Sequence, residues 1–342
     1  MGKRRMINAP SDKAIRELLS AAGLGHEYSL QPLIGGANNR VYSIQMPKRR
    51  LVLKAYFYDP EGGRDRLESE FSFLQYLWKR GIRSVPEPLS SLPALQFALY
   101  EFVQGRKLLP HEVTGERVSE ALEFILSANH GLEPPDYTGL PLAYGACFTA
   151  ATHIEQIESR VTRLLTSITG SDRESIQAKR FVESTLLPAY DRFRRALLDE
   201  LGSNADNISS GCLSPSDFGF HNALVGDEDK LLFIDFEDAG YDDPAKLVCD
   251  FFCRPALPAG EEHLRYFVDS ICRAFPEDKL LAKRISLLLP LYRIKWCCVL
   301  LNEFLPSEGK RSLFSRGDGA DLVPRRKRGL DKAERMLERL LS

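Results

Sequence analysis

The sequence predicts an α+β fold with two lobes, a small N-terminal lobe built on an antiparallel sheet and a large, mainly helical C-terminal lobe. The chain has 342 residues, and a single hydrophobic core usually stops growing at roughly 250 to 300 residues. Short alternating segments, separated by glycine or proline, dominate the first part of the chain, whereas helical spacing dominates the rest. The boundary falls after residue 104, which gives lobes of residues 1–104 and 105–342.

The composition is that of an ordinary globular protein. Hydrophobic residues make up 44% of the chain and charged residues 27%, which excludes disordered, collagen-like and disulfide-scaffold proteins. The formal net charge of −1 removes the attraction on which generic nucleic-acid binding depends, so we expect no nucleic-acid partner. The seven cysteines lack paired spacing, and we expect them as reduced thiols, with Cys249, Cys253, Cys297 and Cys298 in the core rather than bound to a metal.

The apolar segments do not indicate a membrane protein. No apolar segment follows the basic residues 3–5, as a signal peptide would require. The most apolar stretch, residues 285–304, contains Pro290, Arg293 and Lys295, so we expect a pair of buried helices there rather than a membrane span. We therefore expect a cytoplasmic protein without a membrane partner. The sequence does not indicate an oligomeric state.

The N-terminal lobe begins with a short amphipathic helix over residues 12–19. A glycine turn and an alternating strand follow over residues 33–44, and a second strand over residues 51–56 completes a hairpin. The period of two along the second strand places Val52 and Lys54 on one face of the sheet. A lysine that shares a face with a strand valine calls for an explanation.

A helix and a further strand complete this lobe. Apolar residues recur at helical spacing from residue 64 to residue 79, and Gly81 ends the helix. On this helix Glu70 lies beside the apolar face, whereas Glu68 points away from it. The strand over residues 97–103 ends at Gln104 and Gly105.

The C-terminal lobe contains one hairpin among helices. Helical periodicity covers residues 117–130, 154–168 and 175–201, with Pro188 expected to kink or break the last of these helices. Two short strands over residues 222–225 and 230–234 are joined by a polar turn. Helices dominate again from Pro244 onward.

Polar side chains at the two ends of this hairpin carry the chemistry. Asp217 and Asn222 precede the first strand, and Asp235 directly follows the second. The hairpin brings these side chains to the same end, where their oxygen atoms suit Mg²⁺ shared with nucleotide phosphates. A carboxylate left free of the ion could accept a hydroxyl proton. Taken singly, Asp217 and Asn222 could equally serve turn hydrogen bonds, and Lys54 could be a surface lysine.

Together, these motifs resemble the aminoglycoside phosphotransferase family, the small-molecule branch of the protein-kinase-like fold. The resemblance extends from about residue 33 to about residue 250 and rests on the order of its pieces. The pieces are a glycine loop at Gly35–Tyr42, Lys54, Glu70, a hinge-like segment at Tyr100–Gly105, Asp217, Asn222 and Asp235. A bilobal kinase-like fold is what this resemblance implies.

The resemblance also implies nucleotide-binding roles in the N-terminal lobe. Lys54 would bind the α and β phosphates of ATP, with Glu70 orienting it. The loop of Gly35, Gly36 and Asn39 would cover the phosphates through backbone N–H groups. GTP is an open alternative to ATP, since a hinge reads the purine through main-chain groups.

Further roles implied by the resemblance lie in the hinge and the C-terminal lobe. Glu101 and Val103 would offer main-chain groups to adenine. Asp217 would position and deprotonate a hydroxyl of a small-molecule substrate, and Asn222 and Asp235 would bind Mg²⁺. The implied activity is ATP- and Mg²⁺-dependent transfer of the γ-phosphoryl group to a sugar, an amino alcohol or a related metabolite.

One departure from the family pattern motivates an alternative function. The family has a histidine two residues before its catalytic aspartate, and here that position is Pro215. A catalytically silent nucleotide-binding module is therefore the alternative to an active enzyme. A protein kinase is disfavoured, because no Ala-Pro-Glu segment follows Asp235.

The identity of the acceptor is open. Lys and Arg outnumber Asp and Glu from Tyr241 to Ser342, which weighs slightly against a polycationic acceptor. Arg293 and Lys295 could meet an anionic or sugar-like acceptor, or pair with internal acids such as Glu303, and we favour the internal pairs. We expect the acids after Asp235, at positions 237, 238, 242 and 243, to be mostly solvated.

Overall fold

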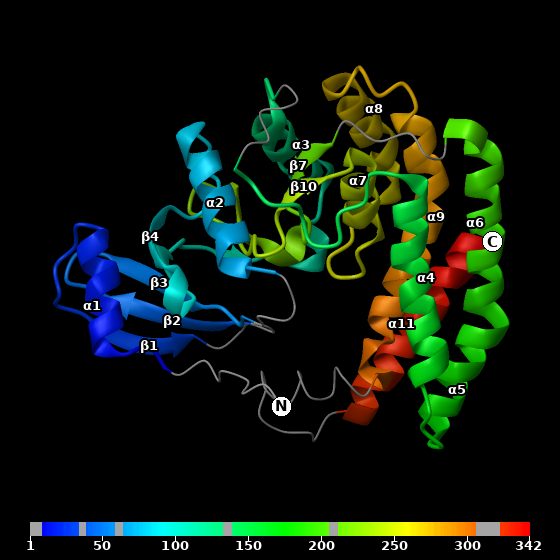
Figure 1. Ribbon diagram of the computed structural model, residues 1–342, viewed down its shortest axis with the longest axis horizontal. Coiled ribbons are helices and arrows are strands. Elements are labelled where there is room, and N and C mark those ends of the chain that lie inside the picture. The colour runs from blue at the N-terminus through cyan, green and yellow to red at the C-terminus, as the bar shows by residue number, and fades with distance from the viewer. Residues whose placement is uncertain (1–8, 34–38, 59–63, 133–138, 205–210, 306–321) are drawn as a thin grey trace.

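The structure is a computed structural model and describes residues 9–33, 39–58, 64–132, 139–204, 211–305 and 322–342. A sheet with its helices lies at one side of the molecule, and a larger group of helices lies at the other (Figure 1). Strands dominate the chain up to residue 101 and helices dominate the chain beyond it. This arrangement confirms the predicted α+β class.

The sheet of the N-terminal lobe has five antiparallel strands. In spatial order they are β1 (Ser29–Leu33), β2 (Arg40–Gln45), β3 (Arg50–Ala55), β5 (Phe97–Glu101) and β4 (Pro88–Leu92). The predicted hairpin is confirmed as the pair β2 and β3, in which Lys54 lies opposite Val41. On its other edge Lys54 lies opposite Ala98 of β5, so the lysine sits on the central strand.

The two faces of this sheet have different neighbours. Leu51 and Leu53 of β3 pack with Leu18 and Leu19 of helix α1 (Asp12–Ala21), which covers the outer face. Lys54 has the opposite parity and lies on the inner face, toward helix α2 (Arg66–Lys79) and the C-terminal lobe. The alternation predicted for this strand is therefore confirmed.

Helix α2 brings an acid to the inner face of the sheet. The side chain of Asp65 accepts the backbone N–H of Glu68 at 3.0 Å and caps the start of the helix. Leu67, Leu74 and Leu77 are buried on one side of α2. Glu70 is buried with them and only 2% exposed, whereas Glu68 is exposed, as predicted.

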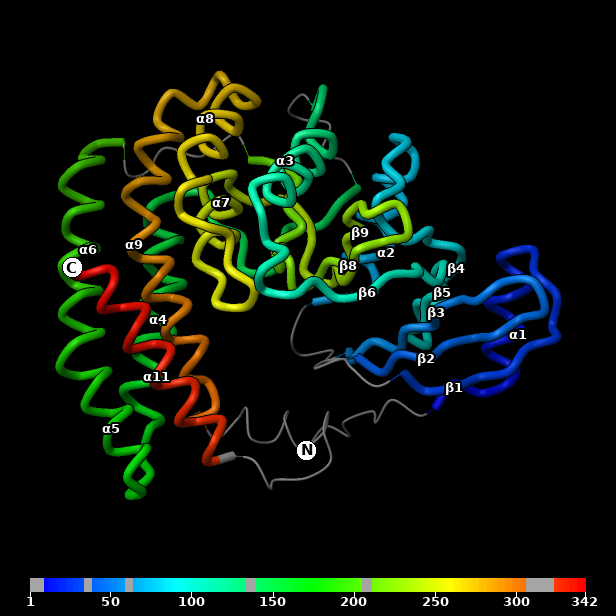
Figure 2. Tube along the Cα trace, turned by 180° about the vertical axis from the view of Figure 1, so that it is seen from behind, coloured from blue at the N-terminus to red at the C-terminus, as the bar shows by residue number. Residues whose placement is uncertain are grey.

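Two small sheets of short strands follow the hinge. β6 (Arg106–Lys107), β8 (Ala223–Val225) and β9 (Leu231–Phe233) form one small sheet, and β7 (Cys212–Ser214) pairs with β10 (Gly240–Asp242). Figure 2 shows β6, β8 and β9 between α3 and the N-terminal sheet. Strand β6 comes directly after the hinge, so the segment that leaves the N-terminal lobe pairs with the hairpin that carries the chemistry.

The remaining elements of the C-terminal lobe are helices. They are α3 (Gly115–Asn129), α4 (Ala150–Ser167), α5 (Arg173–Phe181), α6 (Leu187–Leu201), α7 (Pro244–Cys253), α8 (Leu264–Ala274), α9 (Leu281–Leu300) and α11 (Leu322–Leu341). A π-helical turn, Val182–Leu186, joins α5 to α6. Pro188 lies in the first turn of α6, where its missing N–H costs little.

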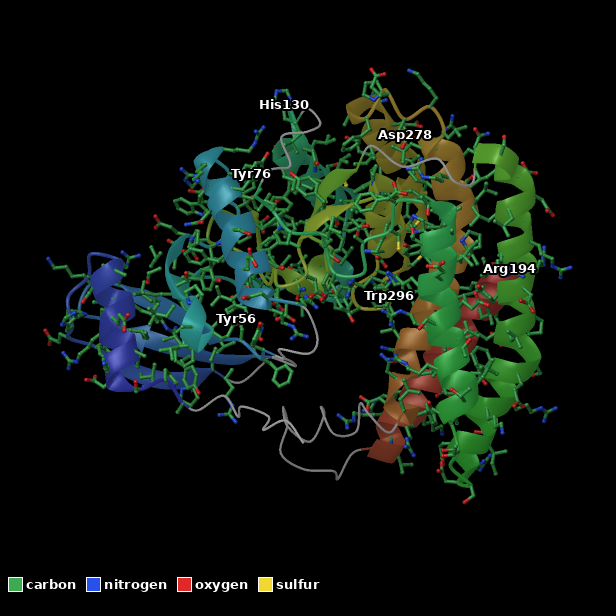
Figure 3. All side chains as sticks on the ribbon, in the orientation of Figure 1. Tyr56, Tyr76, His130, Arg194, Asp278 and Trp296 are labelled. Atoms are coloured by element: carbon green, nitrogen blue, oxygen red, sulfur yellow. The ribbon has the colours of Figure 1, made fainter. Side chains whose placement is uncertain are left out.

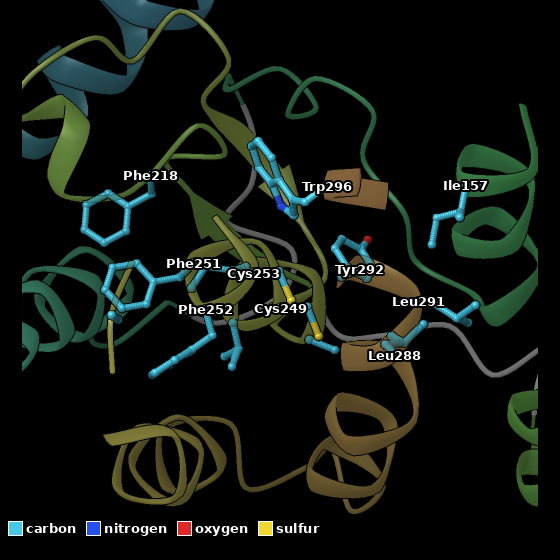
Figure 4. Close-up of a cluster of buried hydrophobic side chains, with 14 of the residues drawn as sticks. Ile157, Phe218, Cys249, Phe251, Phe252, Cys253, Leu288, Leu291, Tyr292 and Trp296 are labelled. Atoms are coloured by element: carbon cyan, nitrogen blue, oxygen red, sulfur yellow. The ribbon is translucent and has the colours of Figure 1, made fainter. Parts of the chain in front are cut away.

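Helices α7 and α9 form the core beneath the hairpin. Phe218, from the loop before β8, stacks on Phe251 of α7 with ring centroids 5.6 Å apart. Cys249 and Cys253 of α7 lie in the same cluster with Leu288 of α9 (Figure 4). These two cysteines are fully buried free thiols, as predicted.

The expectation of two helices over residues 285–304 is wrong. A single helix, α9, runs through Pro290, and only a short 3₁₀ turn, Asn302–Phe304, follows it. Packing of α9 against α4, α6, α7 and α11 overrides the local cost of the proline. Within the described residues, no helix combines the length and the hydrophobicity that a membrane crossing requires.

Candidate active site

The centre of the candidate site is Lys54 between two carboxylates. Its ammonium group donates to Glu70 Oε1 at 2.7 Å and Oε2 at 3.0 Å, and to Asp235 Oδ1 at 3.0 Å. Glu70 belongs to the N-terminal lobe, whereas Asp235 follows β9 of the C-terminal lobe. The side chain of Asp235 is 43% exposed, while those of Lys54 and Glu70 are 14% and 3% exposed. The lysine therefore links the lobes at a point that solvent reaches from the side of Asp235.

Two tyrosines fix the orientation of Glu70. Tyr56 donates to Glu70 Oε2 at 2.6 Å, and the hydroxyl groups of Tyr56 and Tyr100 lie 2.7 Å apart. Burial raises the pKa of both phenols well above the usual value, so they remain protonated donors. Burial also acts to lower the pKa of Lys54, but the charges of Asp235 and Glu70 outweigh it and raise that pKa. Lys54 is thus a fixed positive charge.

Asp217 and Asn222 lie together on the loop before β8. The amide Nδ2 of Asn222 donates to the main-chain oxygen of Asp217 at 3.0 Å and to Asp217 Oδ2 at 3.4 Å. The backbone N–H of Ile234 donates to the carbonyl oxygen of Asn222 at 2.9 Å. This bond joins the loop to the residue directly before Asp235, so the hairpin brings Asp217, Asn222 and Asp235 to the same end of the strands.

Two residues of this site have left-handed backbone conformations. Ser216, next to Asp217, has φ 61°, and Asp235 has φ 70°. Such conformations cost non-glycine residues on the order of 1 to 3 kcal/mol and are held only where the surroundings determine them. Both lie at the candidate site, one next to Asp217 and the other at Asp235 itself.

An arginine and a histidine that we did not predict hold Asp217. The Arg254 guanidinium forms an ion pair with Asp217 Oδ1, and His221 Nε2 lies 3.6 Å from Asp217 Oδ2. Arg254 Nη1 also lies 3.1 Å from His221 Nε2, and Lys107 donates to the carbonyl oxygen of His221 at 2.8 Å. His221, four residues after Asp217, was visible in the sequence. Arg254 is brought in only by the fold, from the end of α7.

These contacts set the charge state of Asp217. Burial acts to raise the pKa of its carboxyl group, but the contact with His221 and the charge of Arg254 outweigh it and hold the pKa well below the usual range. Asp217 is therefore an anion at neutral pH. Pro215, which stands in the place of a histidine, has no side-chain hydrogen-bond donor. In this site His221 and Arg254 contact the carboxylate of Asp217.

Replacing Arg254 is expected to change the pH dependence of the reaction. In Arg254→Met one cause of the low pKa is lost while burial remains, so the pKa of Asp217 rises. The acidic limb of the pH profile of kcat/KM should move to higher pH, and Arg254→Lys should restore part of the difference. Arg265→Met, at an exposed arginine of α8, is the matched control. An acidic limb at the same pH in Arg254→Met and in the wild type would contradict the role given to Arg254.

A second set of contacts between the lobes follows Asp235. Arg64 forms an ion pair with Asp238, and its Nη2 donates to the carbonyl oxygen of Glu237 at 2.6 Å. Arg66 Nε lies 3.6 Å from Glu237 Oε1, and Asn39 Nδ2 also donates to Glu237. Glu237 is buried, so the expectation that it and Asp238 are solvated is wrong. These contacts tie the segment after Asp235 to the N-terminal lobe.

The acids farther along the chain are buried as well. Asp242 and Asp243 are both 0% exposed, which corrects the expectation of solvated side chains. Asp242 pairs with Lys246 at 2.5 Å and accepts the backbone N–H of Cys147 at 3.0 Å. Asp243 pairs with Arg284 at 2.6 Å. A buried carboxylate has to be paired, and the cations that pair with these acids come from α7 and α9.

Lys295 and Arg293 form internal ion pairs, as we favoured, but with other acids. Lys295 donates to Asp250 Oδ1 at 2.7 Å and Oδ2 at 2.9 Å. Arg293 pairs with Glu261 at 2.8 Å. Glu303, the partner that we named, contacts the terminal helix α11 through Arg325 at 3.6 Å.

The remaining predicted nucleotide-binding residues lie at the edges of the site. Glu101 ends β5, and its N–H donates to the carbonyl oxygen of Glu87 at 2.9 Å. Val103 lies just beyond β5, in the segment that leads to the C-terminal lobe. Gly35 and Gly36 lie outside the described residues.

The donor set fits a hard divalent cation. Asp235 offers an exposed carboxylate, and the amide nitrogen of Asn222 is directed at Asp217, which turns the amide oxygen away from that carboxylate. Among the described residues, no group of three or more His, Cys, Asp or Glu side chains could hold a metal. Mg²⁺ commonly takes one or two protein ligands and completes its shell with water and phosphate oxygens. Asn222 and Asp235 match that pattern.

Known proteins resemble this chain in family and in fold. The model of the phosphotransferase enzyme family matches residues 29–253. A choline kinase from Streptococcus pneumoniae is 14% identical with a TM-score of 0.56, and the match covers 95% of this chain and 99% of that chain. A spectinomycin phosphotransferase in complex with ADP and spectinomycin is 14% identical with a TM-score of 0.59, and the match covers 92% of each chain.

A third solved structure, an ethanolamine kinase from Plasmodium vivax, is 14% identical with a TM-score of 0.54, and the match covers 92% of this chain and 83% of that chain. No curated protein sequence matches the chain. Likeness at this level of identity establishes the fold, and it confirms the predicted kinase-like bilobal architecture.

Proposed function

Because the chain belongs to the phosphotransferase enzyme family, as its motifs predicted, it is a kinase-type phosphotransferase, and we propose that it moves the γ-phosphoryl group of ATP, with Mg²⁺, to a hydroxyl group of a small molecule. The observation that carries this proposal is the contact of Lys54 with both Glu70 and Asp235. A phosphate-binding lysine, the acid that orients it and a metal-binding acid have to meet in this way in a kinase-like site.

Groups of both lobes would bind the nucleotide and the metal. Lys54 would bind the α and β phosphates, and the main chain at Glu101 and Val103 would bind the adenine. Mg²⁺, held by Asn222 and Asp235, would supply positive charge against the phosphate oxygens. Phosphoryl transfer needs little covalent help, so positioning and charge neutralisation provide most of the rate.

Asp217 would complete the reaction as the base. The acceptor oxygen forms a bond to the γ phosphorus while the bond from that phosphorus to the β–γ bridging oxygen breaks, and ADP leaves. The hydroxyl proton moves to the carboxylate of Asp217. The low pKa of this carboxyl group keeps it ionised and able to orient the hydroxyl.

Replacing Asp235 tests the assignment of the metal site. Asp235→Asn should raise the dissociation constant for Mg·ATP at least about 10-fold, because the ion loses a charged ligand. Isothermal titration calorimetry with and without Mg²⁺ measures this change. Asp269→Asn, at an exposed position on α8, should bind Mg·ATP as the wild type does. Equal Mg·ATP affinity in Asp235→Asn and wild type would remove the basis of the proposal.

A binding and turnover comparison separates an enzyme from a silent module. Release of ADP that depends on an added alcohol supports the enzyme. Tight binding of Mg·ATP without phosphoryl transfer to any alcohol of a broad panel would instead support the silent module.

A further inference from the structure

Asp217 lines a cavity whose lining residues all belong to the C-terminal lobe. The volume of this cavity is about 380 Å³, and Asp217, α4 and α9 line it. Trp296 of α9 lines the same cavity and lies on the side of the helix that faces the N-terminal lobe (Figure 3). A molecule in this cavity would place a hydroxyl group next to Asp217, so this is where an acceptor would bind.

Positive charge exceeds negative charge around the cavity. Five cationic side chains line it: Arg160, Arg163, Lys246, Arg254 and Lys295. Only three acids line it, namely Asp217, Asp238 and Asp250.

Each of these acids already has a partner in the protein. Asp217 pairs with Arg254 and Asp238 pairs with Arg64. Asp250 pairs with Lys295 at 2.7 Å. An incoming cation would therefore find no unpaired carboxylate among the described residues that line the cavity.

These pairs leave Lys246, Arg160 and Arg163, and Lys246 pairs with Asp242 at 2.5 Å, so Arg160 of α4 and Arg163 remain without a carboxylate among the pairs described. No acid of the described residues forms an ion pair with Arg160, and its Nε is buried without a hydrogen-bond partner. Its neighbour Arg163 donates to the neutral side chain of Asn302 at 3.1 Å. A buried guanidinium N–H without a partner is costly, and a bound carboxylate or phosphate would satisfy it.

The aromatic rings of the cavity are already covered by cations of the protein. The guanidinium of Arg254 lies 4.2 Å from the ring centroid of Trp296, and that of Arg64 lies 4.2 Å from the ring centroid of Tyr144. A quaternary ammonium group would have to displace these contacts to reach the same faces. Both the charge and the rings therefore disfavour a cationic acceptor.

We propose that the acceptor is an alcohol that carries an anionic group, a carboxylate or a phosphate, and that Arg160 binds this group while the hydroxyl lies at Asp217. The proposal names the substrate class for the function proposed above and rests on it. Burial is the main cause that lowers the pKa of Lys295 to about 8 despite its partner Asp250, and repulsion from the charge of Lys246 adds to it. A bound anion relieves that repulsion.

The test compares alcohols of similar size and different charge. D-gluconate and glucose 6-phosphate are the anionic probes, D-sorbitol is the neutral probe, and D-glucosamine is the cationic probe. Isothermal titration calorimetry should show that at least one anion binds at least about tenfold more tightly than D-sorbitol or D-glucosamine, which is about 1.4 kcal/mol. The two anions distinguish a carboxylate site from a phosphate site.

Variants of Arg160 connect this preference to the cavity. Arg160→Gln should lose the preference for the anion, and Arg160→Lys should keep part of it. Arg194→Gln, on α6 and away from Trp296 in Figure 3, should bind all four probes as the wild type does. Thermal unfolding of each variant checks that the fold is intact.

The outcomes separate this proposal from the proposed function. Equal or weaker binding of both anions relative to D-sorbitol, or an unchanged preference in Arg160→Gln, would overturn the anionic acceptor even if ADP is released. Anion binding that depends on Arg160 would support it even if Mg·ATP binding failed, and that failure would count against the kinase activity alone.

Discussion

Asp217→Asn is expected to lower kcat for phosphoryl transfer by about 10²- to 10⁴-fold, the usual contribution of a positioned general base. The amide can neither accept the hydroxyl proton nor hold the ion pair with Arg254. The affinity for Mg·ATP should change little, because the nucleotide would contact Lys54, Asn222 and Asp235 instead. Single-turnover assays with labelled ATP measure the transfer step.

The fold should tolerate this change. The side chain of Asp217 is 38% exposed, so its loss leaves no deeply buried cavity. Asp227→Asn, in the exposed turn between β8 and β9, is the matched control and should keep the wild-type rate. A rate for Asp217→Asn within a factor of a few of the wild-type rate would show that another group accepts the proton. Asp217 would then not be the base.

Arg284→Met is expected to lower the free energy of unfolding by about 3 to 5 kcal/mol, because breaking a buried ion pair leaves an uncompensated charge. Arg284 Nη2 lies 2.6 Å from Asp243 and 2.8 Å from Asp278, and Asp243 is fully buried. Asp243 also contacts His153 at 3.1 Å. With the guanidinium removed, the carboxylate would keep His153 and the backbone N–H of Ala245, which donates to Asp243 Oδ1 at 2.9 Å, but it would lose the charge of Arg284.

Urea denaturation of Lys283→Met provides the comparison for Arg284→Met. Lys283 is adjacent on α9, but its ion pair with Glu200, at 3.1 Å, is exposed. Exposed pairs contribute about 0 to 1 kcal/mol, so this variant should unfold close to the wild type. A loss of similar size in both variants would mean that the buried pair is no more important than a surface pair.

The local motifs of the site were predictable because each depends on a few neighbouring residues. The alternation of β3 placed Lys54 on the inner face, and the helical wheel of α2 turned Glu70 inward. The hairpin made by β8 and β9 has its ends close together, so Asp217, Asn222 and Asp235 necessarily lie near one another. Short-range geometry decides all of these placements.

Contacts between distant segments were not predictable in the same way. Arg254 pairs with Asp217 only because α7 packs beneath the hairpin. The acids at 242 and 243 looked solvated because their cationic partners lie on other turns and helices. Proline disfavours a helix interior, yet α9 continues through Pro290 because α4, α6, α7, α8 and α11 pack against this helix. Tertiary packing supplied the information that the local sequence lacked.

The Lys54–Asp235 pair has a consequence for how ligands enter. A triphosphate that binds the ammonium group of Lys54 must compete for it with the carboxylate of Asp235. A divalent ion can then replace the ammonium group as the counter-ion of that carboxylate. Each exchange makes the other less costly. Metal and nucleotide should consequently bind with positive cooperativity, and by thermodynamic linkage the coupling has the same size in both directions.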